Sequence, residues 1–272
     1  MLFSHFKLLK FVYRGVLTGM PITTYNPITK NNFHAPMTVL PDSTYINFKL
    51  NSLQTAYLND YIQQYNSSLE IIPVNIFEYE APSNYLSVNV YNCSSPLFGD
   101  DKKITRCEIN TYVKDKYDNI GTLIIDYTCS DLSMDPVNIF KSKSKTEFYK
   151  DDLYHCINCE SPEENINFNL NFTGFRCLTH FKDGDDSSEV KISENLIDYT
   201  DNVFYKNGVL DKVYYDSTLT RAKLCVPQYV YNLTFVFKDL IFDDIDSIFY
   251  FTNKINFVGG MWNNIYKIED HA

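Results

Sequence analysis

Much of this chain consists of short segments rich in β-branched and aromatic residues, and in several of them polar and apolar side chains alternate strictly. A period of two is the pattern of a β-strand with one buried face. Turn-forming pairs such as Asp118-Asn119 and Asn207-Gly208 are typical of hairpins. A large antiparallel sheet is therefore predicted. Its expected strands are Leu69–Tyr79, Tyr85–Tyr91, Arg106–Val113, Gly121–Tyr127, Asn165–Phe172, Tyr229–Phe237 and Ser247–Phe257.

One helix is predicted, from Ser52 to Tyr65, where apolar residues recur at spacings of three and four. Asn51 or Ser52 can serve as its N-cap, because a short polar side chain there can accept a bond from a free backbone N–H group. The expected fold class is therefore α+β, mainly antiparallel β. The residues expected to form the buried stripe of the helix are Leu53, Ala56, Tyr57 and Tyr61.

The chain shows no internal repeat and no linker, so residues 42–272 are expected to form one domain. Residues 1–41 contain no Asp or Glu and are basic, and they include an amphipathic stretch. We expect this segment to lie on the domain. An organelle-targeting presequence or a membrane-surface helix is the alternative, since both are basic, amphipathic and poor in acids. The apolar residues of the stretch are Leu2, Phe6, Leu9, Tyr13 and Val16.

Charge and hydropathy exclude several classes of protein. The net charge of −10 repels phosphate backbones, and no basic stretch with interleaved aromatics offsets it, so nucleic-acid binding is not expected. No apolar run approaches the ~18–20 residues that cross a bilayer, so membrane insertion is not expected either. The seven cysteines are an odd number in a chain too long to need disulfides, which favours a reducing, cytoplasmic location. The 27 Asn and 20 Lys against 4 Arg indicate A/T-rich codons.

The most informative segment runs from Arg106 to Lys116. As a strand it would have one polar and one largely apolar face. A polar face is usually solvated, and the alternative is the lining of a polar pocket inside a curled sheet. In such a pocket the amine of Lys114 could form an imine with a carbonyl group, provided that burial and the like charge of Lys116 lowered its pKa. The polar face would carry Arg106, Glu108, Asn110, Tyr112 and Lys114, and the other face Cys107, Ile109, Thr111 and Val113.

This segment resembles the active-site strand of acetoacetate decarboxylases. In that family a Glu, an aliphatic residue, two small residues, an aromatic residue and a proline precede two lysines, of which the first forms the Schiff base and the second lowers its pKa. Val113 stands at the proline and Asp115 at the second lysine. The residues in register are Glu108, Ile109, Tyr112 and Lys114.

Further segments resemble the same family in the same order, from about residue 42 to 260. The resemblance implies a cone-shaped sheet or partial β-barrel with few helices, and it admits a homo-oligomer. The matching segments are Tyr45–Phe48 with the following helix, Leu69–Val74, Thr220–Leu224, Asp239-Leu240 and Ser247–Asn253.

The resemblance implies a Schiff-base lyase that acts on a small keto acid, by decarboxylation or related C–C chemistry, without a cofactor or metal. Its catalytic residues would be Lys114 and Lys116, and its substrate-binding residues Arg106 and Glu108.

Two departures from the family pattern favour an alternative function. The family's arginine that engages the substrate carboxylate corresponds to Ser43, and its glutamate in a Tyr-x-Glu element corresponds to Ser87. Without these charges the chain would be a catalytically inactive member that binds a small molecule or a protein partner.

A second alternative is a zinc-stabilised interaction protein. Cys156, Cys159, Cys177 and His180 have the spacing Cys-x₂-Cys-x₁₇-Cys-x₂-His, which suits a structural zinc site. The predicted strand Asn165–Phe172 would instead set the two halves ~20 Å apart. Buried free cysteines that act as small apolar residues are the other interpretation.

Overall fold

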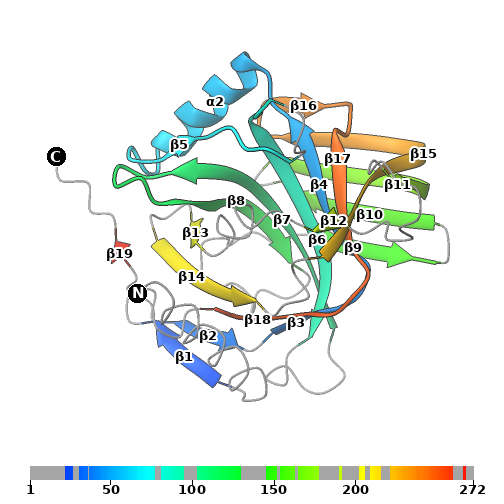
Figure 1. Ribbon diagram of the computed structural model, residues 1–272, viewed down its shortest axis with the longest axis horizontal. Helices are drawn as coiled ribbons and strands as arrows, with labels where there is room; N and C mark the ends of the chain where they lie inside the picture. Colours follow the sequence, from blue (N-terminus) through cyan, green and yellow to red (C-terminus); the bar gives the residue numbers. More distant parts are fainter. Residues whose placement is uncertain are drawn as a thin grey trace.

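The described part of the chain is mostly β-strand, with one α-helix (Figure 1). The fold class is therefore α+β with mainly antiparallel strands, as the sequence predicts. In this computed structural model the described residues are 22–26, 31–35, 37–76, 81–94, 103–129, 145–151, 154–162, 165–177, 190–191, 202–205, 209–215, 221–259 and 266–267.

Four long strands form the middle of the sheet, and each pairs antiparallel with the next. In pairing order they are β4 (Ser43–Lys49), β6 (Tyr85–Ser94), β7 (Lys103–Lys114) and β8 (Ile120–Cys129). Beyond β8 the pairing continues and returns to β6, so the sheet curls strongly. The returning strands are β13 (Asn202–Tyr205), β14 (Val209–Tyr215), β18 (Ile255–Gly259) and β3 (Met37–Val39).

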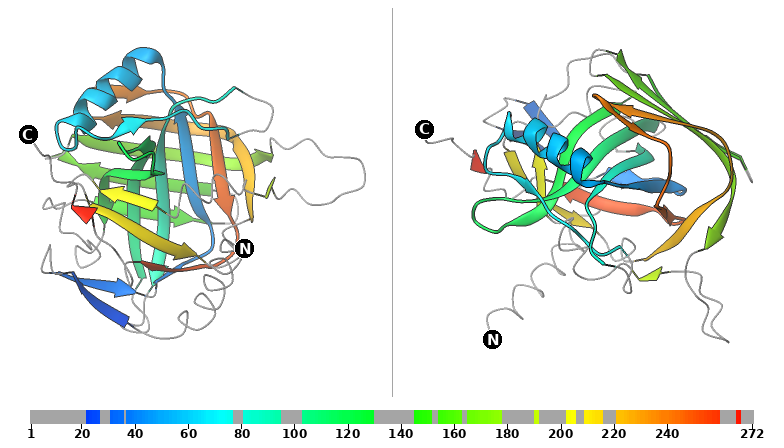
Figure 2. Two further views of the ribbon diagram at one scale, coloured as in Figure 1. Left: turned by 60° about the vertical axis from the view of Figure 1, so that its left-hand side comes forward. Right: turned by 90° about the horizontal axis from the view of Figure 1, so that it is seen from above.

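On its other side β4 pairs with β17 (Ser247–Phe251), which leads to four further strands. These four strands are called the wing, and Figure 2 shows its curvature from two sides. With the wing, the curled sheet forms a partial barrel. The strands of the wing, in pairing order, are β15 (Arg221–Phe237), β11 (Ile166–Cys177), β10 (Tyr154–Ser161) and β9 (Lys145–Lys150).

Six short strands complete the described sheet structure. β1 (Ile22–Asn26) and β2 (Asn31–Ala35) pair with each other. The others add to long strands: β5 (Glu70–Ile71) to β7, β12 (Val190–Lys191) and β16 (Leu240–Phe242) to β15, and β19 (Tyr266–Lys267) to β14. Of the expected N-terminal segment, residues 1–21 lie outside the described residues.

The helix α2 (Ser52–Gln63) begins where the sequence predicts. Asn51 is its N-cap, and a capping box joins Asn51 and Gln54 through two bonds of 2.9 Å. The expected stripe is wrong in part, because Leu53 is 83% exposed and the buried helix residues are Leu58 and Ile62. No helix in the described part of the chain has the length and apolar character that crossing a bilayer requires.

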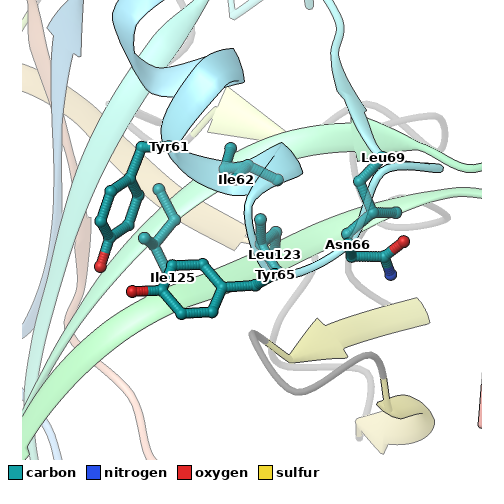
Figure 3. Close-up of a pocket in the computed structure, with 7 residues that line it drawn as sticks. All are labelled: Tyr61, Ile62, Tyr65, Asn66, Leu69, Leu123 and Ile125. Atoms are coloured by element: carbon teal, nitrogen blue, oxygen red, sulfur yellow. The ribbon is translucent and has the colours of Figure 1, made fainter.

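The hydrophobic core lies between the middle strands, α2 and the wing. Phe48 of β4 meets Phe235 of β15 at a ring-centroid distance of 4.8 Å, and Phe168 of β11 stands edge-on to both. Under the last turn of α2, a small apolar crevice separates Ile62 from Leu123 of β8 (Figure 3). Its free volume of about 10 Å³ holds at most one water molecule, so it is not a ligand site.

Two predicted strands differ from the observed ones. Of the predicted strand Leu69–Tyr79, the described residues 69–76 contribute only β5, because the chain leaves the ladder before Pro73, which has no N–H group to donate. Ser247–Phe257 is divided into β17 and β18, because the two halves pair with different strands, β4 and β3. The turn at Asp118 is confirmed, with a φ of 59°.

A β-bulge interrupts the pairing of β7 with β8. Ile109 pairs with Asp126 and Asn110 with Ile124, so Ile125 is an extra residue in β8. As a result Asp126 lies on the same side as Ile109, facing the core, where it is fully buried. The Nζ atom of Lys238 lies 3.1 Å from its carboxylate.

Candidate functional site

The polar face of β7 is buried and not solvated. Arg106, Glu108 and Asn110 are only 2–8% exposed. The opposite face carries Cys107 and Ile109, which belong to the hydrophobic core. The two faces therefore separate as the alternation predicts, but the usual expectation of a solvated face is wrong here.

Polar side chains of β4 and β6 continue this surface, which is called the inner face. The register sets residues of the three strands side by side in rows. The middle row consists of Tyr45, Asn89 and Glu108. The row on one side of it consists of Asn47, Ser87 and Asn110. The row on its other side contains Tyr91 and Arg106, with Ser43 at the end of β4.

Glu108 is the centre of a hydrogen-bond network on the inner face. Its Oε1 atom lies 2.7 Å from Nε of Arg106 and accepts a bond of 2.8 Å from the hydroxyl of Tyr91. Amide groups of Asn89 and Asn110 lie 3.4 and 3.5 Å from its Oε2 atom. A buried carboxylate is stable when it is paired and hydrogen-bonded in this way. The network therefore holds a fixed negative charge beside a fixed positive one.

The phenol groups of this face remain neutral donors. Burial raises the pKa of Tyr45 to about 12, and its hydroxyl lies among the side chains of Tyr112, Ser87 and Asn110. Burial also raises the pKa of Tyr91 well above its ordinary value. Both phenols therefore stay protonated near neutral pH and are unsuited to act as bases.

The middle row keeps accessible surface. Tyr45 and Asn89 are half-buried, whereas the side chains in the rows on either side are buried. Beside it, the buried Oδ1 atom of Asn110 has no hydrogen-bond partner among the described residues. Buried polar atoms are normally paired. The inner face thus keeps some accessible surface at the middle row, and a buried acceptor without a partner among the described residues lies next to Glu108.

Lys114 lies at the far end of β7 and is not enclosed. Its side chain is 41% exposed, and its Nζ atom lies 3.3 Å from the carboxylate of Glu70, which is 60% exposed. Eight residues separate it from Arg106, or about 26 Å along a strand. The predicted catalytic lysine and the predicted substrate-binding residues Arg106 and Glu108 therefore do not meet around one small molecule.

Lys116 does not share the face of Lys114, because β7 ends at Lys114. The carboxylate of Asp115 accepts bonds of 2.8 Å from the backbone N–H groups of Tyr117 and Asn119 and so fixes a turn. Lys116 is exposed in this turn, with its Nζ atom 5.3 Å from the ring centre of Tyr117. The expectation that the strand continues past Lys114 is wrong.

Both serines that stand at the family's charged positions are buried on the inner face. The hydroxyl of Ser87 donates a bond of 2.8 Å to Asn47. The Oγ atom of Ser43 has no hydrogen-bond partner among the described residues. Neither serine can anchor a carboxylate through charge.

A second cluster, which no sequence pattern indicated, joins three separate segments of the chain. Lys150, at the end of β9, lies 2.5 Å from Asp42 and 2.8 Å from the hydroxyl of Tyr250, which also donates to Asp42. Burial acts to lower the pKa of Lys150, but the bonds to Asp42 and Tyr250 raise it overall. A hollow of about 390 Å³ opens beside the cluster. The distinctive local feature of the cluster is the turn at Asp42, where the backbone φ angle is 73°.

The ring of His155 lies behind this cluster. It stacks on Phe172 with ring centroids 4.6 Å apart, and it is 3% exposed. Burial lowers its pKa to about 4, and the nearby positive charge of Lys150 adds to this effect. His155 is therefore neutral at pH 7.

The three cysteines of the predicted zinc site do not come together in the described structure. Cys156 and Cys159 point to opposite faces of β10, with Cys159 in the core and Cys156 half-buried. Cys177 is nine residues along β11 from Phe168, the partner of Cys159, which is about 30 Å. His180 lies outside the described residues.

Comparisons with known proteins show likeness among solved structures. No family model matches the chain, and no curated protein matches it. Among solved structures, it is similar to an acetoacetate decarboxylase-like enzyme from Sphingomonas wittichii RW1, with a TM-score of 0.44 and 7% sequence identity over 82% of this chain and 89% of that one. This likeness is one of fold.

Proposed function

We propose that this chain binds a small polar molecule on the inner face of β4, β6 and β7. The observation that carries the proposal is the half-buried middle row, Tyr45 and Asn89, between rows that are buried. A ligand there would meet the ring of Tyr45 and the amide of Asn89, beside the carboxylate of Glu108.

The test is a thermal-shift screen of the purified chain against small polar metabolites, with pyruvate and acetoacetate included. Each hit is repeated with Asn89→Tyr, which fills the accessible row, and with Asn167→Tyr, an exposed position on β11, as the matched control. We expect the Asn89 variant to lose the shift and the control to keep it. If no compound raises the melting temperature, or if both variants respond equally, the proposal is wrong.

A Schiff-base lyase that acts on a small keto acid is the second candidate. The specific observation for it is that Lys114 shares the polar side of β7 with Glu108. The position of Lys114 works against it, because its side chain is 41% exposed and its Nζ atom is engaged by the carboxylate of Glu70 at 3.3 Å, so the amine is not enclosed in a pocket.

Borohydride trapping separates the two candidates. The chain is incubated with acetoacetate or pyruvate, reduced, digested and analysed by mass spectrometry. A stable adduct on Lys114 would support the lyase, and its absence with both keto acids would leave the binding function.

A further inference from the structure

The outer face of the wing carries a group of tyrosines at one end. Tyr154 of β10, Thr173 of β11 and Tyr229 of β15 are neighbours in register. The ring of Tyr231 lies 6.4 Å from that of Tyr154, and its hydroxyl lies 3.4 Å from that of Thr173. Tyr229 and Tyr231 are 61% and 68% exposed. The strands of the wing can be followed in Figure 1.

Asparagine side chains occupy the next positions along the same face. Asn171 and Asn232 are partners in register, and Asn158 and Asn169 form the following row. The amides of Asn171 and Asn232 both donate to Oδ1 of Asn169, at 3.3 and 3.0 Å. The Oδ1 atoms of Asn171 and Asn158 have no hydrogen-bond partner among the described residues. These two oxygens are buried, whereas Asn232 is exposed and presents its side-chain amide at the surface.

The rows of tyrosine and asparagine carry no charge of their own. At their edge, beside Asn158, Glu147 of β9 is paired with Lys145, whose Nζ atom lies 3.3 Å from its carboxylate. Residues 154–158, 169–173 and 229–234 contain no Asp, Glu, Lys or Arg, in a chain of net charge −10. His155, which lies within the first of these segments, is buried and neutral. A charged partner would find no unpaired opposite charge in these three segments, and a purely apolar partner would bury the amides unpaired.

We propose that the outer face of the wing binds a neutral oligosaccharide. A sugar ring has an apolar C–H face, which would lie on the exposed rings of Tyr229 and Tyr231. Its hydroxyl groups donate and accept hydrogen bonds, as the asparagine amides do. The tyrosine row and the Asn171 row are about 7 Å apart along the strands, so one sugar unit on the rings places the next on the amides. This site is separate from the inner face.

The test is native affinity electrophoresis of the full chain in gels that contain soluble starch, β-glucan, mannan or xylan. Dextran and dextran sulfate form a matched neutral and charged pair. Expression in bacteria keeps Asn171 and Asn232, each of which begins an Asn-x-Thr sequence, unmodified. We expect at least one neutral polymer to retain the protein, and Tyr231→Ala and Tyr229→Ala each to weaken the retention by about fivefold or more.

Tyr117→Ala is the matched control, because Tyr117 is 70% exposed in the turn after β7. It should leave the retention unchanged. The proposal is overturned if no neutral polymer retains the chain, if dextran sulfate alone does so, or if the control loses as much as the two wing variants. It is also overturned if size-exclusion chromatography shows that Tyr231→Ala converts a dimer into a monomer, because the face would then be covered by a second copy.

Discussion

The buried ion pair between Asp126 and Lys238 gives the sharpest test of the fold. The Nζ atom of Lys238 lies 3.1 Å from the carboxylate of Asp126, and the side chains of Asp126 and Lys238 are 0% and 13% exposed. At an effective dielectric constant of about 20, the attraction is about 5 kcal/mol. Breaking such a pair from one side costs about 3–5 kcal/mol, because the remaining charge stays buried. We therefore expect Lys238→Met to lower the free energy of unfolding by about 4 kcal/mol and the melting temperature by about 10 °C.

Asp126→Asn should cost less than Lys238→Met, because the remaining Lys238 reaches water and lies over the rings of Tyr61 and Phe237. The double variant Asp126→Leu with Lys238→Met should cost less than Lys238→Met alone. Equilibrium urea unfolding followed by circular dichroism measures all three.

The control is the pair of Lys49 and Asp246, which has the same 3.1 Å separation but side chains 42% and 17% exposed. Lys49→Ala should cost less than about 1 kcal/mol. Equal losses for Lys49→Ala and Lys238→Met would refute the reasoning, since burial would then not decide the strength of the pair.

Three further predictions concern single residues. The folded-state pKa of His155, about 4, is below the unfolded value of 6.5, so the free energy of unfolding should fall by up to about 3 kcal/mol as the pH drops from 6.5 to 4. Urea unfolding of His155→Phe should show a weaker dependence of this free energy on pH than the wild type. Gly121→Ala should destabilise by about 1–3 kcal/mol in the same assay, because a Cβ atom there would lie 2.4 Å from the backbone oxygen of Asn202, and a wild-type midpoint would contradict this. Lys114→Ala should change the unfolding free energy by less than about 1 kcal/mol, and a larger loss would mean that its ion pair with Glu70 is stronger than its exposure indicates.

Strands and their faces could be predicted from the sequence because they depend on local alternation. The faces of β7 are an example: Cys107 and Ile109 entered the core, and Glu108 and Asn110 the opposite side. The helix start was predictable for the same reason, since the cap at Asn51 uses residues three apart.

The candidate site was predicted only in part, because its geometry depends on contacts between distant segments. Lys114 is exposed because β7 ends there in a turn, and its partner Glu70 comes from a separate strand. The cluster of Asp42, Lys150 and Tyr250 joins residues 108 and 208 positions apart, which no local pattern reveals.

The bulge at Ile125 in β8 determines on which side of the sheet the carboxylate of Asp126 lies relative to that of Glu108. With uninterrupted pairing, Asp126 would stand opposite Glu108, and two carboxylates would compete for Arg106 on the inner face. Because of the bulge, the side chain of Asp126 lies on the core side of the sheet, where it pairs with Lys238, and Glu108 pairs with Arg106 on the inner face. Deleting Ile125 would therefore leave each acid on its present side, because the two strands would then pair without a bulge in the registers that already flank it.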